Sequence, residues 1–428
     1  MARGGRHLRG VAIPIAVLLA ALALGSCTGS DESEGAGTEL TWFMQNQPGG
    51  SVQEIAKRCT EESNGRYHIK VELLAAFDAN QAREQLVRRL GAEDSSMDII
   101  GMDVIWTSEF ANAGWIREWT GDDAQAATKN VFDTVVDTAT FEGNLYGAPL
   151  NSNTQVLWYR TDLVKQPPTT WQQTLDESSR LGDQGVVQVQ ANRYEGLTAW
   201  FNSMVESAGT SILSGPEQVD LAEQPTDRAL SLMGALANSP TAAAPDIDTS
   251  DEGTAAIGFE AGSSAFMLNY TFAYASASAN APDIAKTMGA ARWPAVDDGK
   301  PSRPPLGGFN LGVSEYSENP ELAFEAATCL TNEQSQLTFT ELDGLPPARE
   351  NLYKDPVVKK AYPDFAGLVR QSIDDAAPRP ATPAYTDLSF AIQRALHPVG
   401  DIDPSDPMPT YDELRSALED AVQREGLL

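Results

Sequence analysis

Met97-Asp98-Ile99-Ile100-Gly101-Met102 is a short apolar run, and its neighbours decide how the chain is expected to fold. Its length suits a buried strand better than a helix. Two further strands are expected upstream, at 39–43 and at 67–73, where apolar and polar residues alternate. Amphipathic helices, one opening near Ser51 and one over 81–90, separate these strands. This βαβ rhythm predicts an α/β lobe with a largely parallel sheet.

Three clusters rich in Gly and Pro divide the rest of the chain. Gly147-Ala148-Pro149 interrupts the rhythm, 303–308 indicates a return crossing, and 344–347 indicates a third one. Several crossings between two α/β lobes are typical of a hinged clamp, with a ligand cleft between the lobes. The domains we expect are a signal peptide at 1–26, a flexible tether at 27–38, lobe I at 39–149 and 305–345, and lobe II at 150–304 and 346–428.

The N-terminus is shaped for export. Arg3, Arg6 and Arg9 precede an apolar run at 11–24, and Gly25-Ser26 leads directly into Cys27. This order is typical of a bacterial lipoprotein signal, after which Cys27 carries the lipid. We therefore expect a protein anchored by lipid to the extracellular face of the cell membrane. The alternative is an ordinary secretory signal followed by a chance cysteine.

Charge and cysteine content narrow the class of partner. The 428 residues carry a formal net charge of −30, so a nucleic acid is not expected as a partner. Apart from Cys27, only Cys59 and Cys329 are present. An exported chain with two remaining cysteines predicts a Cys59–Cys329 disulfide, which would place both residues in one lobe. The alternative is two buried free thiols.

The usual signatures of enzymes and cofactor sites are missing from the sequence. It has neither a phosphate-binding loop, nor a dinucleotide fingerprint, nor a Gly-x-Ser-x-Gly elbow. His7, His68 and His397 are the only histidines, so a histidine-based metal site or catalytic triad is not expected. We predict no cofactor, no metal and no catalytic residue, and a monomer.

Candidate ligand residues follow strand ends or lie in loops, where open α/β sheets bind ligands. Each also has a purely structural interpretation as a cap, a turn former, a core residue or a surface ion pair. Together they suit a sugar, because Asp, Asn and Arg bind pairs of hydroxyl groups and aromatic rings stack on C–H faces. The group comprises Asp103, Asn151, Asn153, Asn192, Tyr194, Glu195, Glu252, Asn269, Tyr270 and Arg379.

Several separated motifs occur in one order along the chain. They are Asp98–Trp106, Leu145–Pro149 with Asn153–Arg160, Tyr194–Phe201, Gly307–Leu311, Gly344–Pro346 and Arg379–Tyr385. In these residues the sequence resembles the extracytoplasmic sugar-binding proteins of ABC importers, the maltose-binding-like group, and in particular the trehalose-binding lipoproteins of the LpqY type. The resemblance extends over residues 39–428.

This resemblance implies an α/β fold of the periplasmic-binding-protein type, a two-lobed clamp with hinge crossings and a ligand cleft between the lobes. It also implies the activity and the site. It implies a lipid-anchored binding protein that closes on a disaccharide, trehalose first and maltose-like sugars next, and delivers it to permease subunits with a cytoplasmic ATPase. It also implies that Asp103, Asn153, Glu252 and Arg379 contact hydroxyl groups, that Tyr270 is the aromatic platform where relatives tend to carry tryptophan, and that backbone near Gly308 closes on the sugar. The complete set of expected ligand residues is Asn46, Asp103, Asn153, Glu195, Glu252, Tyr270, Gly308 and Arg379.

Two other functions compete with transport. A secreted glycoside hydrolase could use two of the carboxylates of Asp98, Asp103, Glu195 and Glu252 as acid and nucleophile. A cell-envelope scaffold without a small-molecule ligand would have no deep polar cleft.

Overall fold

The computed structural model describes residues 37–74 and 79–423. The predicted signal peptide, Cys27 and the tether up to residue 36 therefore lie outside the described residues. Thr38, the last residue of the predicted tether, already belongs to the first strand. No helix within 37–74 or 79–423 is long and apolar enough to cross a bilayer.

Twelve strands form within the described residues. They are β1 (Thr38–Gln45), β2 (Tyr67–Leu74), β3 (Ile99–Asp103), β4 (Thr140–Phe141), β5 (Asn144–Leu145), β6 (Ala148–Arg160), β7 (Val187–Gln188), β8 (Leu213–Gly215), β9 (Gln218–Val219), β10 (Phe266–Tyr270), β11 (Met288–Ala291) and β12 (Leu306–Val313).

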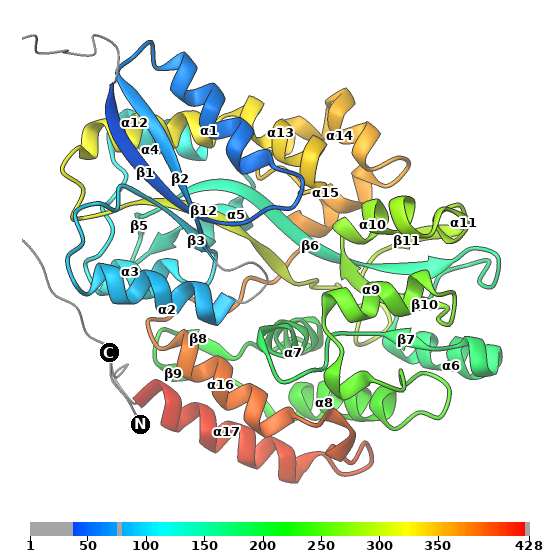
Figure 1. The fold of residues 1–428 in the computed structure, drawn as a ribbon. Helices are drawn as coiled ribbons and strands as arrows, with labels where there is room; N and C mark the ends of the chain where they lie inside the picture. Colours follow the sequence, from blue (N-terminus) through cyan, green and yellow to red (C-terminus); the bar gives the residue numbers. More distant parts are fainter. Residues whose placement is uncertain (1–36, 75–78, 424–428) are drawn as a thin grey trace, which may run out of the picture. The chain divides into compact units, whose positions relative to one another are not determined.

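The α-helices between and after these strands cover the sheet (Figure 1). They are α1 (Ser51–Glu62), α2 (Ala79–Leu90), α3 (Thr107–Asn112), α4 (Gly121–Thr128), α5 (Asp133–Thr138), α6 (Trp171–Leu181), α7 (Glu195–Ala208), α8 (Glu223–Ala237), α9 (Glu252–Glu260), α10 (Phe272–Asn280), α11 (Pro282–Ala285), α12 (Pro320–Leu330), α13 (Glu333–Asp343), α14 (Pro356–Ala361), α15 (Ala366–Asp374), α16 (Tyr385–Leu396) and α17 (Met408–Gln423).

One sheet with the strand order β2-β1-β3-β12-β6-β10-β7 runs through the described chain, and β11 also pairs with β6. The first three strands are parallel, as their βαβ connections predict. β12 returns after a long excursion and is antiparallel to both β3 and β6. The prediction of a largely parallel sheet is therefore correct for β1–β3, but the complete sheet is mixed.

The long strand β6 passes from one half of the sheet to the other. Its residues 148–154 pair with β12, and its residues 155–159 pair with β10. Gly147-Ala148-Pro149, expected to interrupt the βαβ rhythm, leads into β6, which begins at Ala148 and contains Pro149. The parallel pattern does end here, because β6 is antiparallel to β12 and β10. Proline cannot donate to a ladder, and Pro149 lies opposite Asn310, where the register of β12 shifts.

The first lobe consists of β1, β2, β3 and β12 with the helices packed on them. Alternate side chains of β1 point to opposite faces of the sheet. Leu40, Trp42 and Met44 pack with α1 and α12, whereas Phe43 packs with α2 and β3. Both faces of these strands are thus covered by helices, as is typical of buried parallel strands.

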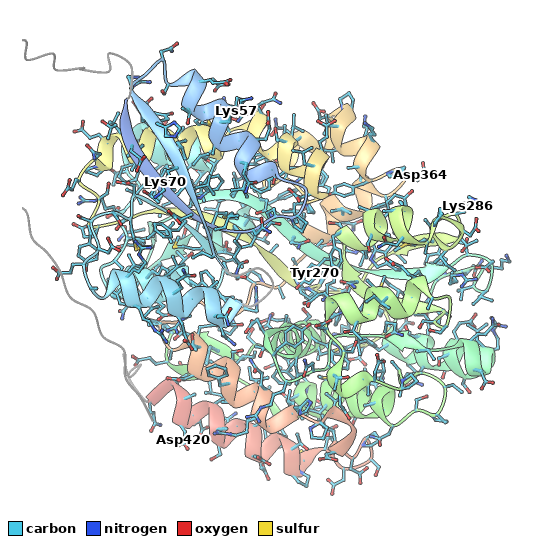
Figure 2. The ribbon with its side chains drawn as sticks, viewed as in Figure 1. Lys57, Lys70, Tyr270, Lys286, Asp364 and Asp420 are labelled. Atoms are coloured by element: carbon cyan, nitrogen blue, oxygen red, sulfur yellow. A yellow bond between two sulfur atoms is a disulfide. The ribbon has the colours of Figure 1, made fainter. Side chains whose placement is uncertain are left out.

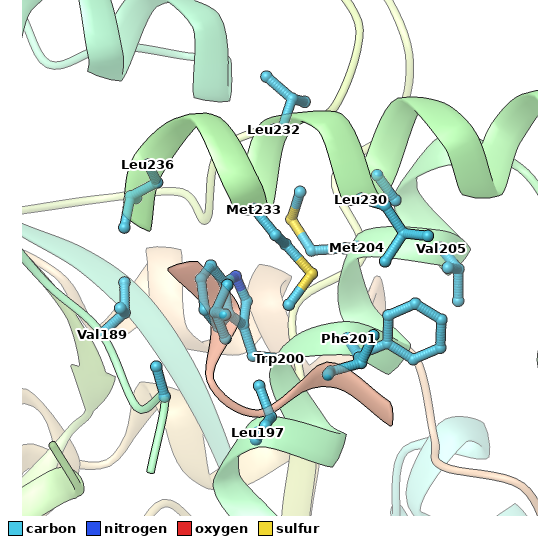
Figure 3. Close-up of a cluster of buried hydrophobic side chains, with 14 of the residues drawn as sticks. Val189, Leu197, Trp200, Phe201, Met204, Val205, Leu230, Leu232, Met233 and Leu236 are labelled. Atoms are coloured by element: carbon cyan, nitrogen blue, oxygen red, sulfur yellow. The ribbon is translucent and has the colours of Figure 1, made fainter. Parts of the chain in front are cut away.

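The second lobe consists of β7, β10 and β11 with α6–α9, α16 and α17. Trp200, Phe201 and Met204 of α7 face Leu230 and Met233 of α8 in its core (Figure 3). These five side chains are at most 2 % exposed. Helix α7 is buried at nearly every position, because it lies between α8 and α16.

A separate apolar cluster lies where the crossings meet. It brings Trp158 of β6 and Leu306 of β12 together with Phe132, Ala348 and Tyr362. The crossings therefore share a packed core and are not free linkers. The lobe boundaries predicted above, at 149/150, 304/305 and 345/346, lie close to this cluster, and they remain our proposal for the division of the chain.

Cys59 of α1 and Cys329 of α12 form the predicted disulfide, across 270 residues of sequence. Both cysteines belong to the first lobe, which confirms the inference drawn from their pairing. A second long-range link is made by Asp98, which accepts hydrogen bonds from the Thr41 backbone N–H and the Ser317 hydroxyl. Asp98 thus joins β1 to the turn after β12 and has a structural role.

Candidate functional site

The structure places five of the predicted ligand residues at the ends of secondary-structure elements or between them. Asp103 is the last residue of β3 and Tyr270 the last of β10. Glu195 and Glu252 are the first residues of α7 and α9. Arg379 lies in the Pro-flanked segment between α15 and α16. Such positions place polar side chains at the ends of rigid elements, where binding residues are common.

Arg379 lies between carboxylates from the two lobes. Its Nη1 is 2.5 Å from Oε1 of Glu195, in the second lobe, and its Nη2 is 3.5 Å from Oδ1 of Asp103, in the first. The arginine side chain is only 7 % exposed. Charge pairs held this far from water interact more strongly than pairs on the surface.

Glu195 is itself held by three donors. Besides Arg379, the Tyr385 hydroxyl donates to Oε1, and the Ser389 hydroxyl donates to Oε2 at 2.6 Å. Tyr385 and Ser389 are four residues apart on α16, so they present their hydroxyl groups from one helix face. The arrangement fixes the Glu195 carboxylate, and through it the orientation of Arg379.

Burial and neighbouring charges shift the pKa values of this cluster in opposite directions. Burial raises the pKa of Asp103, and Arg379 partly offsets that rise. For Arg379, burial opposes the charge, but Tyr385, Glu195 and Asp103 together hold its pKa well above the ordinary value. The guanidinium therefore stays charged, whereas burial disfavours the charged form of Asp103.

A second group, formed by Tyr194, Glu252 and Tyr270, lies in the same region of the second lobe. Burial raises the pKa of Glu252, and burial followed by the charge of Glu252 raises the pKa of Tyr194 and Tyr270. Tyr270 lies near the middle of the view in Figure 2. The charge of Arg379 opposes this rise for Tyr270, and those of Asp103 and Glu195 add to it.

The strand that faces this site is β12. A Cβ atom added to Gly307 would lie 3.6 Å from Asn153 Cβ and 3.9 Å from Tyr270 Cε1, with nothing closer. Gly308 has a φ of +132°, and a Cβ there would lie 2.5 Å from the Asn151 carbonyl oxygen. Gly308 thus packs against β6, and its carbonyl accepts from Val104 N–H. Gly307, and not the predicted Gly308, faces Asn153 and Tyr270.

Other predicted residues are engaged in the scaffold or lie apart. Asn151 is 1 % exposed and accepts from the Phe309 N–H, and Asn269 donates to the Glu252 carbonyl. Asn192 accepts from the N–H of Arg193. Asn46 follows β1 and is partly buried, and no hydrogen bond within the described chain joins it to the Arg379 cluster.

Three residues of this group were not among the predicted ligand residues, although Tyr385 and Gly307 lie within the motifs quoted above. Tyr385 and Ser389 were not singled out, because a hydroxyl group inside an amphipathic helix carries no signal of its own. Their spacing of four residues, just after Arg379, was the available clue. Gly308 was predicted instead of the adjacent Gly307, because the sequence does not show which glycine of a pair has the positive φ.

A pocket of about 260 Å³ adjoins Arg379. Arg379 is the one predicted ligand residue in its lining. Within the described residues, no group of His, Cys, Asp and Glu side chains is placed to hold a metal ion.

The raised pKa of Glu252 makes stability depend on pH. Because its pKa is higher in the folded state, this carboxyl group binds more protons in the folded than in the unfolded protein. The free energy of unfolding therefore falls as the pH rises from the ordinary carboxyl pKa, about 4, to the raised pKa of the folded state. We expect Glu252→Gln to remove part of this slope, by at most about 1.4 kcal/mol per pH unit. Urea unfolding across a pH series from 4 to 7 measures it.

Asp283→Asn is a suitable control, because the hydrogen bond with Lys286 lowers the pKa of Asp283. Its contribution to the pH dependence of the free energy of unfolding therefore has the opposite sign, and it occurs at pH values below the ordinary carboxyl pKa. A Glu252→Gln slope that matches that of the unmodified protein would contradict the prediction.

Comparison with known proteins identifies the family. Residues 54–367 match the family model described as bacterial extracellular solute-binding protein. A probable ABC transporter-binding protein of Deinococcus radiodurans is 32% identical over 77% of this chain and 81% of its own length. A galactooligosaccharide-binding protein of Bacillus subtilis is 23% identical over 90% of this chain and 91% of its own length.

The fold agrees with this result. The maltose-bound structure of T. maritima MalE3 superimposes with a TM-score of 0.77 at 24% identity, over 90% of this chain and 99% of that protein. This likeness confirms the predicted two-lobed α/β fold that resembles periplasmic binding proteins. With the family match over most of its length, the chain belongs to the bacterial extracellular solute-binding proteins.

Proposed function

We propose that this chain is the sugar-binding component of an ABC importer, anchored by a lipid on Cys27 at the extracellular face of the membrane. It binds a disaccharide between its lobes, trehalose first and maltose-like sugars next, and delivers it to permease subunits driven by a cytoplasmic ATPase. The names of the Deinococcus and Bacillus relatives support an ABC importer and an oligosaccharide ligand.

The observation that carries the proposal is the position of Arg379 between Glu195 and Asp103, which belong to different lobes. A sugar hydroxyl can accept from a guanidinium and donate to a carboxylate at the same time. A ligand that replaces the 3.5 Å contact between Arg379 and Asp103 would therefore bind both lobes together. That coupling is what lobe closure around a ligand requires.

The carboxylates are less suited to glycoside hydrolysis. Of the four that could supply an acid and a nucleophile, Asp98 is bonded within the first lobe and Glu195 already accepts from three donors. A nucleophile and a general acid must instead face the scissile bond from opposite sides. We therefore favour binding without catalysis.

Sugar binding is tested by thermal shift over trehalose, maltose, sucrose, cellobiose and their monosaccharides. A ligand that binds only the folded protein raises its melting temperature, so at least one disaccharide should do so. Arg379→Ala should raise the Kd of that sugar about 100-fold, because it removes a buried charged donor. Arg228→Ala, at an exposed ion pair of the second lobe, is the control. A panel without any shift would refute the function.

The two glycines offer a matched pair of variants. Gly307→Ala fits without a clash but places a methyl group between Asn153 and Tyr270, so it should raise the sugar Kd about tenfold with little change in stability. Gly308→Ala should instead lower the free energy of unfolding by about 1–3 kcal/mol, because of its φ and its clash with β6. Equal effects of both variants on sugar binding would contradict our assignment of Gly307.

Lipid anchoring is tested by mass spectrometry of the mature N-terminal peptide and by cell fractionation. The expected result is an acylated Cys27 and a membrane-bound protein, which Cys27→Ser would remove from the membrane fraction. Recovery of unmodified wild-type protein from the medium would instead support an ordinary secretory signal.

A further inference from the structure

The segment that carries Arg379 has few main-chain donors by which it can be attached. Arg379 lies between Pro378 and Pro380, and proline has no backbone N–H group. Just before this stretch, the Ala377 N–H donates to the Pro304 carbonyl at 2.9 Å, which ties the segment to the chain that leads into β12. Within the stretch only the Arg379 N–H could donate, so its attachment depends mainly on its carbonyl groups.

Asn202 of α7 supplies a donor for these carbonyl groups. Its Nδ2 lies 3.4 Å from the Ala377 carbonyl oxygen and 3.3 Å from the Pro378 carbonyl oxygen, and it donates to both. Because both partners are acceptors, the amide nitrogen and not the amide oxygen must face them. Pro378 directly precedes Arg379, so this contact holds the main chain at the point from which the guanidinium extends.

The place of Asn202 in the fold is unfavourable for stability alone. The residue is 1 % exposed, lies inside a helix, and is followed and preceded along α7 by core residues such as Phe201 and Met204. Its Oδ1 accepts no hydrogen bond from any residue of 37–74 or 79–423. Asparagine is a poor helix former, and an unpaired buried acceptor costs free energy. The contribution of Asn202 therefore lies in its contacts with the two carbonyl groups.

The same helix also holds the other end of Arg379. Glu195, the first residue of α7, lies 2.5 Å from Nη1 of the guanidinium, and Asn202 follows seven residues, or about two turns, further along. Residues at this spacing lie on one face of a helix. Helix α7 thus fixes both the main chain and the guanidinium of Arg379 to the second lobe, whereas Asp103, 3.5 Å from Nη2, belongs to the first.

We infer that Asn202 is a positioning residue for ligand binding. It sets the place of the Arg379 guanidinium relative to Asp103, and so determines whether one ligand can contact both, although Asn202 does not line the pocket beside Arg379. The inference rests on the proposed sugar-binding function. Loss of Asn202 should therefore weaken sugar binding more than it weakens the fold.

Asn202→Leu removes both donors and keeps a side chain of similar size. Calorimetry should show that it raises the Kd of the bound disaccharide about tenfold. Ser203→Ala is the matched control, because Ser203 is also buried on α7, has an unpartnered hydroxyl group within the described chain and lies outside the pocket. It should leave the Kd unchanged within about twofold. Asn202→Ala, which lacks a donor and favours the helix, replaces Asn202→Leu if that variant does not fold.

A double-mutant cycle separates positioning of Arg379 from a general loss of structure. Arg379→Ala alone should raise the Kd about 100-fold. Adding Asn202→Leu should raise it no further, because the group that Asn202 positions is then absent. Independent effects would instead multiply to about 1,000-fold, and that result would overturn the inference.

The NMR resonance of the Arg379 Nε–H group tests the inference without any sugar. The Arg379→Lys variant identifies this resonance by its loss. In the ligand-free protein, Asn202→Leu should shift or broaden it, and Ser203→Ala should leave it in place. An unchanged resonance in Asn202→Leu would overturn the positioning role. A shifted resonance together with failure of every sugar to bind would refute the proposed function and leave the positioning of Arg379 standing, so the two failures are distinguishable.

Discussion

The pairing of β6 with two different partners is the constraint on which the rest of the structure depends. A strand of 13 residues pairs with β12 over its first part and with β10 over its last. The two lobes therefore share a backbone ladder, and their crossings are packed against one apolar cluster that contains Trp158 and Leu306. Any relative movement of the lobes must bend this strand and its neighbours. The lobes can therefore move relative to each other in only a few directions. The site residues lie around this strand, so a small bend there moves them relative to one another.

Electrostatics in the site follows from burial on this scaffold. Arg379, at 7 % exposure, needs anionic partners, and it finds one in each lobe. The charge of the one guanidinium is thus compensated inside the protein by two carboxyl groups, and the group presents hydrogen-bond donors and acceptors side by side. Glu195 contributes by orienting Arg379 through Tyr385 and Ser389, which distinguishes it from Asp103, whose carboxylate has fewer protein partners.

Local patterns predicted much of the fold and part of the site. The strands and helices up to residue 103 follow from the periodicity of apolar residues, and the Cys59–Cys329 bridge follows from the cysteine count. The continuity of β6 through Pro149 was not predictable, because it depends on a register shift opposite Pro149 in the partner strand β12, at Phe309/Asn310. Arg379, Asp103 and Glu195 were each predicted as ligand residues, but their contact with one another depends on the tertiary structure and could not be predicted. The orientation of Gly307 likewise depends on a backbone angle that residue type does not specify.

The position of β12 in the sheet sets the order in which the protein can be assembled. This strand lies between β3 and β6, yet it is residues 306–313 of the chain, and the helix that bears Cys329 follows it. The first lobe thus lacks an inner strand until about three quarters of the polypeptide has left the ribosome and crossed the membrane. The inserted second lobe has all of β7, β10 and β11 available earlier. Its helices α16 and α17, however, come from the C-terminal end of the chain and belong to its core, so each lobe is completed only by a segment that arrives late.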